Sequence, residues 1–252
     1  MELPRAWQRP DPLRGLDRIS WAEVYDGRGG AGRLPRRLLR ELVDPAPEVR
    51  LDAFTSLADR LLTEDTVSEA SFCAVPFLVE LGASYKVAAA DVRDRVIFLL
   101  AALALAGKGF TEDGRRTHRR WNALGRELPR TAPDWLTQTR HAVAQGAPKI
   151  FEALASERVG CLVALACAVP EKLPAFVVGL MQDMLDDEEE LLAEAAEIAV
   201  ALLKRTPELV EPEPKVLGEG LVRPAHQPQE VTAALMGYRF ALTAAYGDEG
   251  AW

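Results

Sequence analysis

The stretch LPRRLLRELVDPAPEVRLDAFTSLADRLL, residues 34–62, decides the fold that we predict for this chain. It contains two runs of apolar residues at helical spacing, separated by Asp44-Pro45-Ala46-Pro47. Two prolines so close together end a helix, because proline lacks the amide proton and restricts the residue before it. We therefore predict two short antiparallel helices, each with one apolar face that other helices must cover.

The same plan recurs along the chain. Four segments begin with a proline followed by apolar residues at helical spacing, and proline at the first position of a helix costs no hydrogen bond. A second helix follows each of them, and acidic residues in its first turn complement the positive end of the helix dipole. The predicted first helices start at Pro35, Pro76, Pro148 and Pro174, and the predicted second helices span residues 48–62, 91–106, 157–169 and 188–204.

The spacing of these pairs indicates the architecture. Successive prolines lie 41, 72 and 26 residues apart, and a shorter copy at Pro207 follows after 33 more. Helical pairs at such spacing are typical of α-solenoids, in which each pair is buried only against its neighbours. Ala and Leu dominate these segments and only 7% of residues are aromatic, which favours helices over strands.

We thus predict an all-α fold, a right-handed α-solenoid of about four to five helical pairs that forms one domain over residues 1–252. Outside the pairs we expect an irregular arm at residues 1–19 and a single turn at 21–25 that packs Trp21 over the first pair. We also expect an insertion at 107–130, an extra helix at 133–145, a loop rich in Pro and Glu at 207–228, and a C-terminal capping helix at about 229–246.

Residues 42–57, with the pattern LVDPxPxVRxxAxxxL, resemble a HEAT repeat, in which the Asp before the turn and the Arg of the second helix bond across neighbouring repeats. Val92-Arg93, 43 residues further on, resembles a second copy of the Val-Arg pair. Across residues 20–106, WAEVYxG, DTVxxA and AVPFL occur in the order found in uncharacterised bacterial HEAT-like proteins, which often look like toxin-neutralising or adaptor proteins. The resemblance implies a HEAT-like solenoid and a role in protein binding.

Charge and composition exclude several classes of function. The chain has 30 Lys or Arg against 38 Asp or Glu, a net charge of −8, so its surface repels phosphates and we do not expect nucleic acid as a partner. Its three cysteines, Cys73, Cys161 and Cys167, lack metal-site spacing, and we expect buried free thiols in a reducing cytoplasm. The polar N-terminus and an apolar run of only residues 96–106 predict a cytoplasmic protein without a membrane segment.

Acidic residues form the main candidate site. Residues 171–252 hold sixteen Asp or Glu against six Lys or Arg, and the helix at 48–62 carries a similar acidic face opposite its apolar one. The two middle second helices are apolar on nearly all sides, which predicts a core role. Acidic rows are either solvated helix faces or docking sites for a basic partner. The predicted partner-binding residues are Asp183, Asp186, Asp187, Glu188, Glu190, Glu194, Glu197, Glu48, Asp52 and Asp59.

The insertion at residues 107–130 has the opposite charge, with seven basic residues against three acidic ones. It is either a solvated loop, an internal partner for the acidic end of the chain, or a contact for phosphate or nucleic acid. The residues that would make that contact are Arg115, Arg116, Arg119, Arg120 and Trp121.

Catalytic motifs are missing from the sequence. The three histidines, His118, His141 and His226, stand in separate contexts, and no P-loop or Gly-x-Ser-x-Gly pattern occurs, so we expect no metal, no cofactor and no enzymatic activity. We predict a protein-binding module, specifically a bacterial immunity-type protein that neutralises a basic toxin through its acidic surface. The alternative is a HEAT-like DNA-binding protein or DNA glycosylase that uses the basic insertion. The binding face and the oligomeric state stay open.

Overall fold

The computed structural model describes residues 13, 15–26, 29, 30, 32, 34–62, 67–84, 88–106, 134–154, 160–183, 185, 193, 196, 197, 199 and 200. Most of them are helical, which confirms the predicted all-α class. The α-helices are α1 (Leu34–Glu41), α2 (Pro47–Leu61), α3 (Glu69–Gly82), α4 (Ala90–Leu105), α6 (Trp135–Ala153), α7 (Gly160–Ala168) and α8 (Ala175–Asp183). Two single 3-10 turns, η2 (Leu16–Arg18) and η3 (Pro170–Lys172), and a two-residue antiparallel ladder between β1 (Tyr25–Asp26) and β2 (Gly29–Gly30) complete the described elements.

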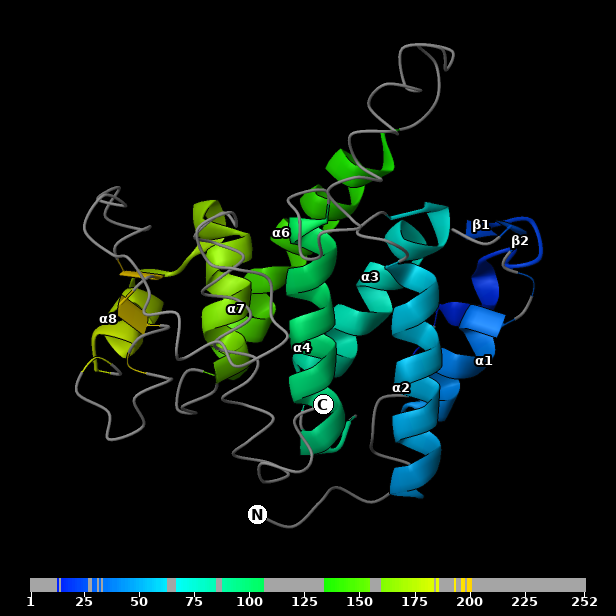
Figure 1. The fold of residues 1–252 in the computed structure, drawn as a ribbon, viewed down its shortest axis with the longest axis horizontal. Coiled ribbons are helices and arrows are strands. Elements are labelled where there is room, and N and C mark those ends of the chain that lie inside the picture. The colour runs from blue at the N-terminus through cyan, green and yellow to red at the C-terminus, as the bar shows by residue number, and fades with distance from the viewer. Residues whose placement is uncertain are drawn as a thin grey trace, which may run out of the picture.

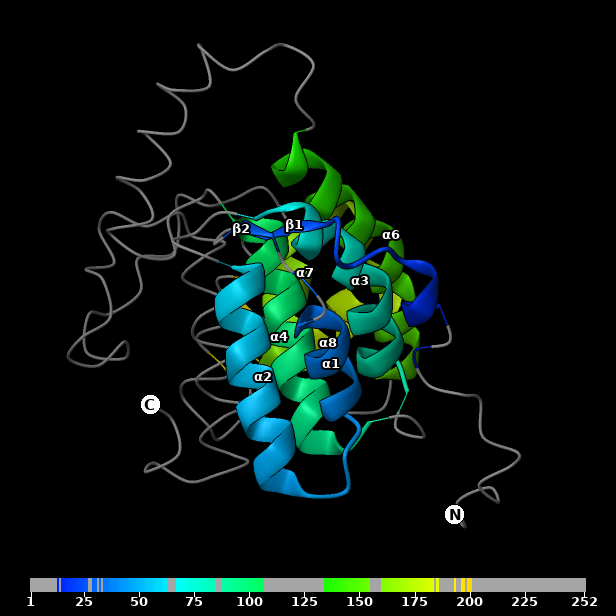
Figure 2. The same cartoon turned by 90° about the vertical axis from the view of Figure 1, so that its right-hand side faces the viewer.

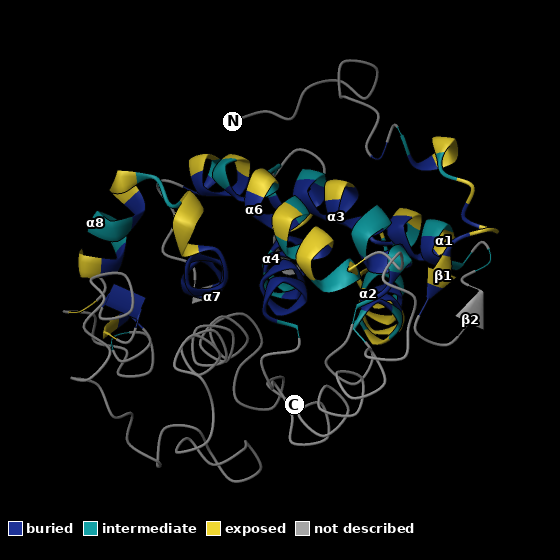
Figure 3. Ribbon diagram, turned by 90° about the horizontal axis from the view of Figure 1, so that it is seen from above, coloured by how far each residue is buried: buried dark blue, intermediate teal, exposed yellow. Residues whose placement is uncertain are grey.

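The helices lie in two rows. They follow one another along the long axis of the molecule from α1 to α8 (Figure 1). Seen from above, α1, α3, α6 and α8 form one row, and α2, α4 and α7 form the other (Figure 3). Within a pair α1 packs on α2 and α3 on α4, and along the rows α3 packs on α6, and α4 on both α2 and α7. Each new helix thus covers an apolar face that the preceding helices leave open.

The second helices are found where the sequence predicts them. Residues 48–62, 91–106 and 157–169 correspond to α2, α4 and α7. Residues 99–105 of α4 and 161–168 of α7 are all buried, which confirms the core role of these two helices. Of the fourth predicted second helix, only residues 193, 196, 197, 199 and 200 are described, and they are helical. The insertion at 107–130, the loop at 207–228 and the capping helix at 229–246 lie outside the described residues.

Two of the four proline-based helix starts are wrong. Pro35 and Pro174 do stand at the beginnings of α1 and α8, but Pro76 lies inside α3 and Pro148 inside α6. α3 begins earlier because Ser68 and the side chain of Ser71 form a reciprocal capping box around its first turn.

The first helix of the third pair also begins earlier than predicted, because of a cap. α6 begins after Asp134, whose carboxylate accepts a hydrogen bond from the amide of Thr137 at 3.2 Å. It then continues through Pro148, so the extra helix predicted at 133–145 and the first helix predicted from Pro148 are one continuous element. An internal proline removes one backbone hydrogen bond, and the buried contacts on both sides of Pro148 hold the helix together across that position.

Of the predicted irregular arm at residues 1–19, the structure describes residues 13 and 15–19. Leu13 and residues 15–26, which we call the N-terminal strap, lie between the side of α3 and β1 at the end of α2 (Figure 2). The amide of Leu13 donates to the Glu80 carboxylate at 3.0 Å, and the buried Leu16 accepts a hydrogen bond from Nε1 of Trp21 at 2.9 Å. The ring of Trp21 contacts Phe77 of α3, with centroids 6.4 Å apart, so it packs on the second helical pair.

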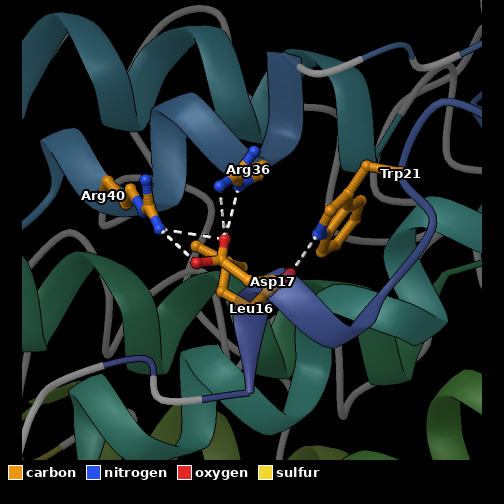
Figure 4. A network of polar contacts seen from close by, with 5 residues as sticks. All are labelled: Leu16, Asp17, Trp21, Arg36 and Arg40. Atoms are coloured by element: carbon orange, nitrogen blue, oxygen red, sulfur yellow. Dashed lines mark hydrogen bonds and ion pairs between the residues drawn. The ribbon is translucent and has the colours of Figure 1, made fainter.

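Ionic contacts fasten the strap at both of its ends. Asp17 accepts hydrogen bonds from Arg36 at 2.6 Å and from Arg40 at 2.7 Å, both on α1 (Figure 4). At the other end Asp26, which is fully buried, pairs with Arg60 of α2 at 2.6 Å. The turn expected at residues 21–25 is correspondingly shorter, because Tyr25 already belongs to β1. The strap therefore joins α1, α2 and α3.

Candidate partner-binding surface

The turn between α1 and α2 fixes the orientation of α2. Arg50 donates to the backbone carbonyls of Asp44 and Pro45, each at 2.9 Å, and the Asp44 carboxylate accepts from the amide of Ala46 at 2.9 Å. Pro47 occupies the first turn of the helix, where its missing amide costs nothing. These bonds of Asp44 and Arg50 lie within one turn, whereas the HEAT resemblance implies bonds between neighbouring repeats.

Three of the predicted partner-binding residues share one exposed face of α2. At about 100° per residue, Glu48, Asp52 and Asp59 fall within an arc of about 40°, and all three are exposed. We call them the acidic stripe. The buried side chains Leu57 and Leu61 face the interior, as the apolar pattern of residues 48–62 predicts.

An open apolar groove runs between α2 and α4 beside the acidic stripe. Its volume is about 290 Å³, at the low end of the range for small-molecule pockets, so it suits a few apolar side chains better than an enclosed cofactor. The two helices that form it lie side by side (Figure 1). The lining residues are Phe54, Ala58, Asp59 and Leu62 from α2 and Phe98, Leu99 and Ala102 from α4.

The groove has a different charge at its two margins. Among the described residues that line the groove, Asp59 is the one with a polar side chain, and it belongs to the acidic stripe. On the α4 side the guanidinium of Arg95 lies over the ring of Phe54, 5.9 Å from its centroid. A ligand in the groove would thus meet the Asp59 carboxylate on the α2 side, while the Arg95 guanidinium covers Phe54 on the α4 side.

The remaining predicted site residues are not brought to this groove. Asp183 is exposed at the end of α8, at the opposite end of the row of helices from α2 (Figure 1), and Glu197 is exposed as well. The other predicted residues lie outside the part of the chain that the structure describes: Asp186, Asp187, Glu188, Glu190 and Glu194 of the acidic set, and Arg115, Arg116, Arg119, Arg120 and Trp121 of the basic insertion.

A cluster of arginines on α1 was not anticipated from the sequence. Arg36, Arg37 and Arg40 border an open cavity of about 400 Å³ together with Glu41 and Asp44. Asp17 bonds Arg36 and Arg40, and Arg37 pairs with Glu41 at 3.3 Å, so carboxylates already accompany these cations (Figure 4). The spacing of Arg36 and Arg40 predicts a shared helix face, but their partner is remote in sequence. We assign the cluster to holding the strap.

The environments of Cys73 and Cys161 favour the thiol form. Burial raises the pKa of Cys161 well above its usual range, and the Asp94 carboxylate, 3.8 Å from its sulfur, raises it further. Burial, followed by the charge of Glu69, also raises the pKa of the half-buried Cys73. A thiol whose pKa is raised is a poor nucleophile, so these two residues do not have the chemistry of a catalytic cysteine. The prediction of buried free thiols is confirmed for Cys161 and Cys167, whereas Cys73 is free but only half-buried.

The described residues form neither a metal site nor a membrane-spanning helix. No three His, Cys, Asp or Glu side chains among the described residues could together hold a metal ion. None of the described helices has both the length and the apolar character needed to cross a bilayer. Comparison of the chain with family models, curated proteins and solved structures finds no match to any of them.

Proposed function

We propose that this chain is a HEAT-like α-solenoid that acts as a non-enzymatic protein-binding module. Support for the solenoid comes from the two rows of helices, in which the pair α1–α2 packs on the pair α3–α4, and that second pair packs on α6 and α7. The observation that carries the binding role is the acidic stripe: Glu48, Asp52 and Asp59 are exposed together on α2, beside an apolar groove. Exposed carboxylates next to an open apolar surface suit a basic protein partner.

Electrostatics favours such a partner. The chain has a net charge of −8, so a basic protein is attracted over a distance of about one Debye length before contact. Of the two arginines of α2, Arg60 bonds Asp26, and Arg50 bonds the carbonyls of the preceding turn. A stable complex would bury about 800 Å² on each partner, which requires contacts beyond the stripe itself.

The partner that we propose is a basic toxin domain, which makes the chain a bacterial immunity-type protein that works in the cytoplasm. The resemblance of residues 20–106 to bacterial HEAT-like proteins motivates this class of partner, and the charge of the stripe is compatible with it. Inhibition would follow from occupying the basic surface that the toxin uses, without chemistry by this chain.

Co-expression with the product of the adjacent gene tests this function. We expect the pair to co-purify and the chain to restore growth of cells that produce the toxin. The absence of both rescue and co-purification would contradict the immunity role.

Charge reversal tests whether the stripe is the docking surface. Glu48→Lys with Asp52→Lys should slow association at least fivefold in low salt, because rim charges act mainly on the on-rate. The matched control is Glu152→Lys, a reversal at an exposed position of α6 in the other row of helices, and it is compared with the single variants Glu48→Lys and Asp52→Lys (Figure 3). An on-rate that is equal in the stripe variants and the control, and independent of salt, would exclude the stripe.

A further inference from the structure

We infer that the groove between α2 and α4 binds one amphipathic, basic helix of a partner protein, with apolar side chains in the groove and Lys or Arg residues against the acidic stripe. This inference rests on the proposed binding function and specifies the chemistry of the partner. The occupant follows from three features of the groove: its apolar lining, its length and the position of the charges.

The apolar side chains on the α2 side of the groove range from buried to exposed. Phe54 is only 7% exposed and lies at the base of the groove, Ala58 and Leu62 are half-buried, and Leu51 is 45% exposed on the same side of the helix. Side chains of this kind leave apolar surface in contact with water, and covering that surface is favourable. A partner therefore gains most by inserting apolar groups here.

The acidic stripe begins directly beyond this apolar margin. Thr55 stands between the two on the surface of α2, and its hydroxyl donates to the carbonyl of Leu51 at 3.0 Å. The boundary residue thus satisfies its hydroxyl within its own helix. A partner helix needs only two kinds of side chain to match the surface: apolar ones for the groove and cationic ones for Glu48, Asp52 and Asp59.

The length of the groove sets the spacing of the apolar side chains. From Phe54 to Leu62 it extends along eight residues of α2, about 12 Å at 1.5 Å per residue. Two or three apolar residues at positions i, i+4 and i+7 of a partner helix cover that distance. The acidic stripe sets the orientation, because the cationic face of the partner must turn toward α2.

A labelled peptide tests the inference with the intact chain. The probe is a 16-residue fluorescein-labelled helical peptide with Leu at i, i+4 and i+7 and Lys along one adjoining face, and binding is measured by fluorescence anisotropy. Two matched peptides carry Ala in place of Leu, or Glu in place of Lys. We expect saturable binding of the first peptide, at least tenfold weaker binding of the Ala peptide, and no binding of the Glu peptide.

Variants of the chain locate the binding site. Ala58→Trp fills the groove and Ala58→Gln places a polar group in it; each should weaken binding at least tenfold, whereas Glu152→Lys should change it less than twofold. Two substitutions at this half-buried position keep the test valid if one of them unfolds the protein, which circular dichroism reports. The inference is overturned if the affinity of the peptide is unchanged both by the two Ala58 substitutions and by replacing its Leu residues with Ala. It is also overturned if the wild-type chain does not bind the Leu/Lys peptide.

The two proposals fail separately. If co-expression gives no rescue while the peptide binds as expected, the toxin-neutralising role is wrong and the helix-binding groove stands. If rescue and co-purification succeed and both Ala58 variants still bind the toxin as tightly as the wild type, the groove is wrong and the immunity role stands.

Discussion

Gly146 allows α6 to pack closely on α3, and adding a single methyl group there should destabilise the protein. A Cβ atom at this position would lie 2.4 Å from Cγ2 of Val79, 2.9 Å from its Cγ1 and 3.2 Å from its Cβ. Rotating the Val79 side chain cannot relieve all three contacts, because its Cβ is fixed by the backbone. In Gly146→Ala the two helices must therefore move apart.

The size of the effect follows from two opposing terms. Overpacking a well-packed core costs about 1–3 kcal/mol, while Ala is favoured over Gly inside a helix by about 1 kcal/mol. We expect a net loss of up to about 2 kcal/mol in the free energy of unfolding. Gly179→Ala in α8 is the control, because a Cβ there meets nothing within 4 Å. This control should gain about 0.5–1 kcal/mol from the helix preference alone.

Urea unfolding, followed by circular dichroism and extrapolated to water, measures both variants. A double-mutant cycle with Val79→Ala identifies the contact: once the valine methyls are gone, the methyl of Ala should cost much less, with a coupling of about 1 kcal/mol or more. A Gly146→Ala variant as stable as the wild type would refute the predicted clash with Val79. So would a loss of stability that simply adds to that of Val79→Ala, without coupling.

Three further changes probe other parts of the structure. Asp26→Ala removes a fully buried carboxylate from Arg60 and should lower the free energy of unfolding by about 2–4 kcal/mol, measured by thermal or urea unfolding. Asp17→Ala breaks only exposed ion pairs and should lower it by less than about 1 kcal/mol. Equal losses in the two variants would contradict the role of burial. Pro76→Ala restores a backbone amide at an exposed position inside α3 and should raise the free energy of unfolding. The gain should be smaller than the ~3 kcal/mol by which Pro disfavours an ordinary helix interior, because α3 already accommodates the ring. A lower midpoint of unfolding would contradict this expectation. Because the pKa of Cys161 is raised in the folded state, the thiol ionises at lower pH in the unfolded chain than in the folded one. Its contribution to the free energy of unfolding is therefore complete below about pH 8.5 and falls above that pH by up to about 1.4 kcal/mol per pH unit. In Cys161→Ala this fall of stability between about pH 8 and 10 should be smaller than in the wild type; an equal fall would contradict the expectation.

Local patterns in the sequence were sufficient for several elements and insufficient for others. The helices α2 and α4 were predicted because apolar residues recur at helical spacing and a break precedes each of them. Pro76 and Pro148 misled the prediction because a proline in the first turn and a proline inside a helix look the same from the residues that follow. The deciding signals are the caps at Ser68 and Asp134, which lie upstream of those prolines.

Of the candidate site, the acidic stripe can be predicted from the sequence and the groove cannot. The acidic stripe follows from the spacing of Glu48, Asp52 and Asp59 within one helix, so the pattern alone predicts it. The groove requires α2 to lie beside α4, and no local pattern states that Leu62 and Ala102 line the same space. The contacts of Asp17 with α1 depend on the path of the strap in the same way, since the two segments are separated by 19 residues or more.

The N-terminal strap has a consequence for how the chain unfolds. In an array whose units touch only their neighbours, each unit can open by itself, and stability is a sum of local terms. Here one segment is bonded to α1 through Asp17, to α2 through Asp26 and to α3 through Leu13, so none of these helices can detach without breaking the strap. The first two pairs should therefore exchange their amide hydrogens as a single cooperative unit, and shortening the chain from its N-terminus past Asp26 should loosen three helices at once.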